Sequence, residues 1–136
     1  MNEGHGPCLS PAEVESFDAV VIGAGIAGLR AADELLRSGH RTLVVDKGRG
    51  VGGRMATRRV GGATFDHGAQ YVHARGPAFA ELIATARDAG EVVEWCHGVP
   101  ELSAGAVDRP ATVSSRTTAW RGAAGMTAPA KWLANE

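Results

Sequence analysis

The stretch "DAVVIGAGIAGLRAADELLRSGHRTLVVD", residues 18–46, decides the fold of this chain. It opens with a short apolar run, 19–22, whose last three residues are β-branched, which is typical of a buried strand. The apolar positions that follow are spaced three to four residues apart, as on one face of a helix, and they are Ile26, Leu29, Ala32 and Leu36. Gly39 stands where such a helix would end, and a second apolar run, 42–45, leads to Asp46. This order predicts a β-α-β unit with two parallel strands.

Three glycines between the first strand and the helix form a G-x-G-x-x-G pattern. Gly23 allows a sharp turn off the strand, a side chain at Gly25 would block a pyrophosphate, and Gly28 lets the helix pack close to the sheet. The helix N-terminus offers unpaired N–H groups and a partial positive charge to phosphates. Asp46, 18 residues beyond the last glycine, can accept hydrogen bonds from ribose hydroxyls. The pattern therefore predicts a dinucleotide site, against the alternative of a glycine-rich turn without a ligand.

The next segment, "VVDKGRGVGGRMATRR" at 44–59, places five basic residues among glycines directly after an acid. It could be a basic arm for nucleic acid, a disordered Gly/Arg tract, or half of a pocket for a phosphate-bearing cofactor. Fourteen Lys and Arg are balanced by fifteen Asp and Glu in the whole chain, whereas nucleic-acid binders usually carry a basic excess. No aromatic residue interleaves the arginines of this segment. These observations favour the cofactor pocket.

Within this segment, Gly52 and Gly53 would let the backbone lie against the cofactor, and Arg54 would place its guanidinium on a pyrophosphate. Lys47, the first residue of the basic tract, joins the expected cofactor contacts. Arg58 and Arg59 are expected in a solvated loop.

Further elements are predicted along the rest of the chain. A helix begins at Pro77 and ends at Gly90, and another begins near Thr127, the expected N-cap residue. Strands are expected around 64–65, over 91–95 and within 111–120. Phe65 is expected in the core.

Composition sets the broad class. With 136 residues, 44% of them hydrophobic, and a net charge of -1, the chain fits one soluble domain, 18–136, after a flexible leader, 1–17. No apolar run is long enough for a membrane helix and no signal-peptide pattern is present, so we expect a cytoplasmic protein. Cys8 and Cys96 suggest no disulfide, and the spacing of His67 and His73 suits no metal site.

Four stretches of the sequence carry a family resemblance. "DKGRGVGGRMATRR" after "VVIGAGIAGL" resembles the D-x-x-x-x-x-G-G-R signature of FAD-binding amine oxidases. With "FDHGAQYVHAR" at 65–75 and "GAAGMTAPAKWLA" at 122–134, the chain is most similar to the renalase-like FAD/NAD(P)-binding oxidoreductases. The resemblance covers about residues 17 to 136.

The resemblance implies an α/β fold, a Rossmann-like FAD-binding β-α-β unit of the glutathione-reductase type with extra helices and short strands. It implies non-covalent FAD, a small Ala27 in the phosphate loop, and a cofactor-facing turn formed by Gly68, Ala69, Gln70 and Tyr71. Such enzymes pass a hydride from a reduced substrate through the flavin to oxygen and release hydrogen peroxide. Renalase-type members oxidise dihydronicotinamide isomers of NAD(P)H.

Members of this family are roughly twice this length or more. We therefore expect an incomplete FAD domain whose later strands and substrate domain are absent, with weak FAD binding and slow or no turnover. Three classes of function remain open: a renalase-like or amine oxidase-like oxidoreductase, a non-catalytic nucleotide-binding module or partner subunit, and a nucleic-acid binder. We expect a small-molecule substrate, and no nucleic acid or membrane partner. The catalytic residues, the substrate and the oligomeric state are left undetermined.

Overall fold

The computed structural model of the chain describes residues 16–98, 100–101, 112–113 and 117–135. Nearly all of the predicted leader therefore lies outside the described residues, as do parts of the expected strand at 111–120. None of the described helices has the length and apolar character that a membrane crossing requires.

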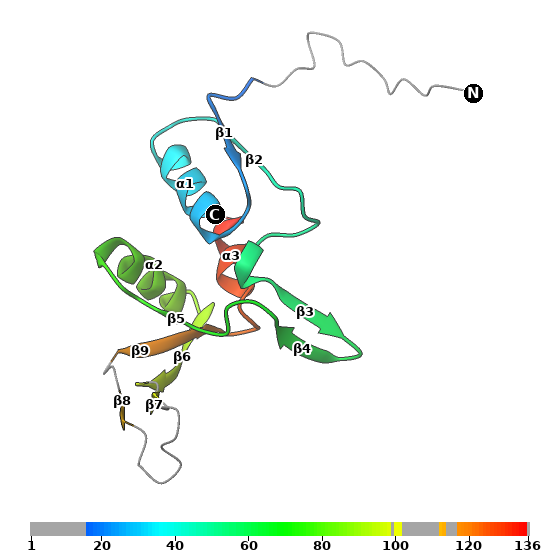
Figure 1. The fold of residues 1–136 in the computed structure, drawn as a ribbon. Coiled ribbons are helices and arrows are strands. Elements are labelled where there is room, and N and C mark those ends of the chain that lie inside the picture. The colour runs from blue at the N-terminus through cyan, green and yellow to red at the C-terminus, as the bar shows by residue number, and fades with distance from the viewer. Residues whose placement is uncertain (1–15, 99, 102–111, 114–116, 136) are drawn as a thin grey trace, which may run out of the picture.

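The predicted β-α-β unit is confirmed (Figure 1). Strand β1, Ala19–Ile22, runs parallel to β2, Thr42–Val45, with Ala19 opposite Thr42 and Ile22 opposite Val45. Helix α1, Ile26–Arg37, forms the crossover between them. Gly39 follows the helix with a φ of 84°, a left-handed conformation that glycine adopts without strain. The chain can therefore turn sharply after α1 and enter β2.

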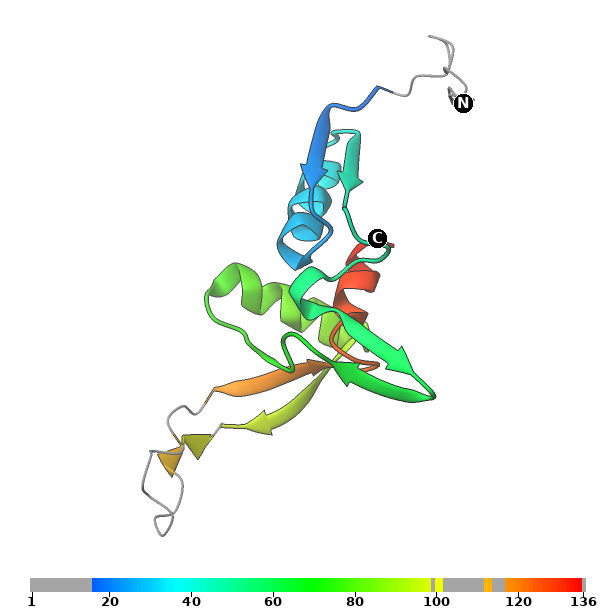
Figure 2. The ribbon, with the colours of Figure 1, turned by 45° about the vertical axis from the view of Figure 1, so that its right-hand side comes forward.

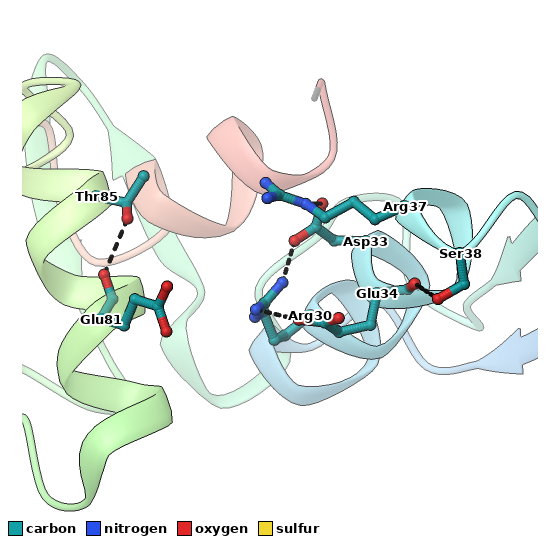
Figure 3. Close-up of polar contacts among 7 residues, drawn as sticks. All are labelled: Arg30, Asp33, Glu34, Arg37, Ser38, Glu81 and Thr85. Atoms are coloured by element: carbon teal, nitrogen blue, oxygen red, sulfur yellow. Dashed lines mark hydrogen bonds and ion pairs between the residues drawn. The ribbon is translucent and has the colours of Figure 1, made fainter.

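Charged side chains on α1 form a short chain of ion pairs (Figure 3). The Asp33 carboxylate lies between Arg30 and Arg37, and the Nε of Arg37 is 2.8 Å from Asp33 Oδ1. Arg30 also pairs with Glu34. These residues are three or four positions apart, where helix side chains meet, and each exposed pair stabilises a helix by only about 0.3–0.5 kcal/mol.

The segment after β2 differs from the predicted loop. A 3-10 helix, Gly53–Met55, is followed by an antiparallel hairpin of β3, Thr57–Val60, and β4, Ala63–Asp66. The prediction that Arg58 and Arg59 lie in a solvated loop is wrong, because both belong to β3. The two turn glycines between the strands have φ values of 57° and 82°, as a two-residue hairpin turn requires.

The expected burial of Phe65 is also wrong, since its side chain is 55% exposed. The hairpin projects from the rest of the described structure, and no second layer formed by the described residues covers its faces (Figure 2).

A second unit follows the hairpin. Helix α2, Pro77–Asp88, packs on a three-stranded antiparallel sheet in the order β5-β9-β6. The sheet strands are β5, Val72–His73; β9, Thr118–Gly122; and β6, Val92–His97. Two further short strands, β7, Pro100–Glu101, and β8, Thr112–Val113, pair with each other. The predicted helix and the strand after it are confirmed.

Helix α3, Ala128–Leu133, joins the two units. Ala130 and Leu133 share a buried cluster with Leu29 of α1, while Trp132 contacts both this cluster and the one beneath α2. The predicted helix start is correct, but Thr127 makes no side-chain capping bond to α3. Its hydroxyl contacts the segment that follows Arg54 instead.

Candidate functional site

The turn between β1 and α1 has the close packing that its glycine pattern predicts. The N–H of Gly23 donates to the carbonyl of Val45 at 2.7 Å, which fixes the turn on the end of β2. A Cβ atom on Gly28 would lie 1.9 Å from the carbonyl oxygen of Gly23. Only glycine therefore allows α1 to approach β1 this closely. A Cβ on Gly25 would meet no protein atom within 4 Å and would point into open space.

The second glycine motif docks directly on the first. The N–H of Gly52 donates to the carbonyl of Ala24 at 2.8 Å, and Gly25 and Gly52 form a parallel bridge. A Cβ on Gly53 would lie 3.4 Å from the Cα of Gly25. We call the combined surface of residues 23–28 and 52–54 the cofactor cradle. Its two halves are more than 20 residues apart in the sequence, and backbone hydrogen bonding brings them together.

Asp46 lies at the edge of the cradle. Its Oδ1 accepts from the N–H of Gly48 at 2.6 Å, and its Oδ2 accepts from the N–H of Ala24 at 2.7 Å. These two N–H groups, that of Gly48 first, hold the pKa of the Asp46 carboxyl below its ordinary value of 3.8. The side chain is exposed, and a carboxylate has about four lone-pair positions, so about two remain for hydroxyl donors.

Arg54 extends from the second half of the cradle. Its side chain is exposed, and its guanidinium has no hydrogen-bond or ion-pair partner among the described residues. Its backbone, in contrast, is fixed, because its carbonyl accepts from the N–H of Ala69 at 2.9 Å. A Cβ on Gly68 would lie 2.0 Å from the same carbonyl oxygen. The turn at 68–69 is therefore part of the cradle's support, a role that sequence reasoning missed.

The other predicted site residues are Ala27, within the cradle, and Lys47, Gln70 and Tyr71, outside it. Ala27 is exposed and lines a hollow of about 290 Å³ between α1 and α2. Lys47 and Gln70 are exposed. The ring of Tyr71 packs against Trp95, with ring centroids 5.1 Å apart.

A hollow of about 350 Å³ adjoins Asp46. Most of its wall is apolar and comes from α1, β2, the loop after β2 and the end of α3. Its larger apolar side chains are Leu29, Leu36, Val44, Val51 and Leu133, and Arg49 of the loop also lines it. The carboxylates of Asp33 and Asp46 line it as well. An apolar slot beside a hydrogen-bond acceptor suits a flat heterocycle joined to a ribose.

Comparisons with known proteins agree with this geometry. Residues 21–86 match the protein family described as NAD(P)-binding Rossmann-like domain. A Mycobacterium tuberculosis protein provisionally named flavin-containing monoamine oxidase AofH is 40% identical over 91 residues, which cover 59% of this chain and 19% of that protein. Pseudooxynicotine dehydrogenase of a Pseudomonas species is 47% identical over 57 residues, covering 42% of this chain and 12% of the relative.

Polyamine oxidase 1 of Oryza sativa subsp. japonica is 40% identical over 100 residues, covering 70% of this chain and 19% of the relative. Among solved structures, putrescine oxidase bound to putrescine is 33% identical with a TM-score of 0.47, over 57% of this chain and 17% of that chain. The chain thus spans about a fifth or less of the length of the curated relatives it matches.

The fold and the family match define a Rossmann-like NAD(P)-binding domain of the α/β class. Within that class, the chain is similar to the N-terminal portion of proteins of the FAD/NAD(P)-binding flavin amine oxidase superfamily. The name of the Mycobacterium tuberculosis relative describes that protein as flavin-containing. None of the relatives named above is a renalase, so the finer resemblance expected from the sequence is not shown.

Proposed function

We propose that this chain is the cofactor-binding part of a flavin-dependent oxidoreductase of the amine oxidase type, and that its cradle holds the adenosine diphosphate half of FAD. The observation that carries this proposal is the docking of the glycine motif at 52–54 on the glycine turn at 23–28. A glycine turn alone is common to many nucleotide sites. A second glycine pair followed by an unpaired arginine supplies a separate contact for the same pyrophosphate.

The charges and spaces of the cradle fit the parts of that ligand. Open space beside Gly25 leaves room for the pyrophosphate, and the first N–H groups of α1 have no partner within the helix. The exposed guanidinium of Arg54 can form two parallel hydrogen bonds to phosphate oxygens. Asp46 offers its remaining lone pairs to the ribose hydroxyls, and the apolar hollow beside it accommodates the adenine ring.

The turn at 68–71 supports an assignment of the flavin end of the ligand. The N–H of Ala69 bonds to the Arg54 carbonyl and so attaches this turn to the cradle. The residues that follow the turn therefore lead away from the proposed pyrophosphate site. Gln70 and Tyr71 are proposed to flank the isoalloxazine ring, as the family resemblance implies. When bound, FAD would accept a hydride from the substrate and deliver the electrons to an acceptor such as oxygen.

The substrate class is proposed from the relatives. Their names favour an amine over the dihydronicotinamide isomers that a renalase-like enzyme would oxidise. The two classes are separable because they differ in the bond that loses the hydride: a C–H beside an amine nitrogen in one, and a ring C–H of a dihydronicotinamide in the other.

Titration of the purified protein with FAD tests whether FAD is the cofactor, and measurements of oxygen consumption test which class of substrate is oxidised. We expect saturable FAD binding that ADP competes for and FMN does not, because the cradle contacts only the adenosine diphosphate half. With cofactor bound, faster oxygen consumption with a polyamine than with dihydronicotinamide isomers would support amine oxidase chemistry. The opposite preference would support the renalase-like alternative, and absence of FAD binding would contradict the proposal as a whole.

A further inference from the structure

We propose that Thr127 is a positioning residue for the cofactor cradle, acting with Thr57 and Asp66 to fix the backbone that carries Arg54. This inference rests on the proposed function, since it concerns how the proposed phosphate contact is held. Thr127 lies 70 positions after Thr57 in the sequence, and the glycine motifs predict no cofactor-binding role for Thr57, Asp66 or Thr127.

The hydroxyl of Thr127 bonds two backbone groups next to Arg54. Its Oγ1 accepts from the N–H of Thr57 at 2.6 Å and donates to the carbonyl of Met55 at 3.2 Å. The N–H of Thr127 in turn donates to Oγ1 of Thr57 at 3.0 Å. Three hydrogen bonds therefore join the residue before α3 to the segment that follows Arg54, across 70 positions of sequence.

Asp66 extends this network to the other support of Arg54. Its Oδ1 accepts from the hydroxyl of Thr57 at 2.5 Å and from the N–H of Met126 at 2.9 Å. Asp66 stands two residues before Gly68, which packs on the Arg54 carbonyl. One hydrogen-bond network thus holds two parts of the chain. The first is the segment after Arg54, and the second is the end of β4, which leads to the turn that contacts the Arg54 carbonyl.

Two glycines allow this network to form. A Cβ on Gly125 would lie 2.7 Å from Cγ2 of Thr57 and 3.3 Å from Oδ1 of Asp66, and its φ is 95°. A Cβ on Gly122 would lie 2.1 Å from the carbonyl oxygen of Gly125. The turn that precedes α3 is therefore shaped for close approach to these two polar side chains.

Helix capping does not account for Thr127. A capping hydroxyl accepts from the N–H at the second or third helix position. The second position is Pro129, which has no N–H, and the Thr127 hydroxyl makes no capping bond to the helix. The Thr127 side chain is 7% exposed and is directed to Met55 and Thr57. Its loss would leave a carbonyl and an N–H unpaired where water has little access.

Arg54 is the residue that this arrangement positions. It lies in the 3-10 helix whose own bonds run from Met55 N–H to Gly52 and from Ala56 N–H to Gly53, at 2.8 and 3.0 Å. Thr127 fixes one end of this helix and Ala69 fixes its middle through the Arg54 carbonyl. These bonds therefore fix the backbone of Arg54, from which its side chain extends, relative to Gly25.

The test compares Thr127→Val, which removes both hydroxyl bonds, with Thr127→Ser, which keeps them. Thr85→Val is the matched control, because the Thr85 hydroxyl donates to the Glu81 carbonyl within α2, away from the cradle (Figure 3). The full chain is used, with two readouts: the dissociation constant for FAD, and the exchange rates of the Met55 and Ala56 amides without cofactor. The substitution does not remove the hydrogen-bond partners of these two amides.

We expect Thr127→Val to raise the dissociation constant roughly tenfold and to speed exchange at Met55 and Ala56 by a similar factor. Thr127→Ser and Thr85→Val should match the wild type in both readouts. The proposal is overturned if Thr127→Val changes neither readout, or if it speeds exchange at Leu29 of α1 by the same factor, which would indicate general destabilisation.

Failure of the proposed function has a different signature. If the wild-type chain binds no FAD, the cofactor assignment fails, and the exchange rates at Met55 and Ala56 alone decide the positioning role. If Thr127→Val does not fold, Thr57→Val breaks the bonds to Asp66 and to the Thr127 N–H and is judged by the same two readouts.

Discussion

Replacing Gly28 and Gly25 by alanine should separate packing from cofactor binding within one turn. At Gly28 the new Cβ would lie 1.9 Å from a backbone oxygen, about 1 Å closer than Cβ atoms are found in proteins. The backbone must move, which costs about 1–3 kcal/mol, while alanine in a helix recovers about 0.5–1 kcal/mol. The net expectation for Gly28→Ala is a loss of roughly 1–2 kcal/mol.

At Gly25 the same substitution has space and a compatible backbone, because no heavy atom lies within 4 Å of the new Cβ and φ is -76°. Its cost in stability should not exceed about 0.7 kcal/mol, the difference between glycine and alanine at an N-cap. The methyl group would, however, occupy the space assigned to the pyrophosphate. We therefore expect FAD affinity to fall at least tenfold, at about 1.4 kcal/mol for each factor of ten.

Thermal denaturation and FAD titration of both variants measure these effects. Gly28→Ala should lower Tm by roughly 3–12 °C, given about 3–6 °C for each kcal/mol in a domain of this size. Gly25→Ala should stay within about 4 °C of the wild type and bind FAD at least tenfold more weakly. Equal Tm values for Gly28→Ala and the wild type would refute the packing argument, and undiminished FAD affinity in Gly25→Ala would refute the placement of the pyrophosphate.

Three further predictions concern other parts of the structure. Asp46 has a lowered pKa in the folded state, so its contribution to stability is present above its ordinary pKa of 3.8 and is lost as the pH falls through the folded value. Asp46→Asn should accordingly flatten the loss of stability in denaturant titrations below about pH 4. Gly68→Ala should cost about 1–3 kcal/mol by urea denaturation, because the Cβ would lie 2.0 Å from the Arg54 carbonyl; a wild-type midpoint would contradict this. Asp33→Ala should cost about 0.5–1.5 kcal/mol by the same measurement, since two arginines of α1 lose a shared partner, and 1 M salt should reduce the effect.

The sequence predicted the β-α-β unit because its information is local. Apolar spacing, a glycine turn and Gly39 lie within one continuous stretch, and each constrains only its neighbours. The same reasoning located α2 and the strand after it. It failed for Phe65, since the expectation of a strand there does not reveal whether another layer covers the strand.

The cradle was predicted in part. Two glycine motifs suggested that 23–28 and 52–54 serve one ligand, and their backbone contact agrees with that suggestion. The supports were missed, because the bonds of Thr127 cross 70 residues and Gly68 matters through a carbonyl 14 positions earlier in the chain. No local pattern carries such information. Tyr71 likewise packs on Trp95, and its ring position depends on a strand pairing that the sequence does not specify.

The cradle as a site for the adenosine diphosphate half of FAD is tested most directly by titrating FAD into wild-type protein and Arg54→Ala, with ADP and FMN as competitors. We predict saturable 1:1 binding by the wild type, displacement by ADP and not by FMN, and affinity ten- to a hundredfold lower in Arg54→Ala, as expected for loss of about 1.5–3 kcal/mol of charge-assisted hydrogen bonding. An unchanged dissociation constant in Arg54→Ala, or displacement of FAD by FMN but not by ADP, would contradict the account.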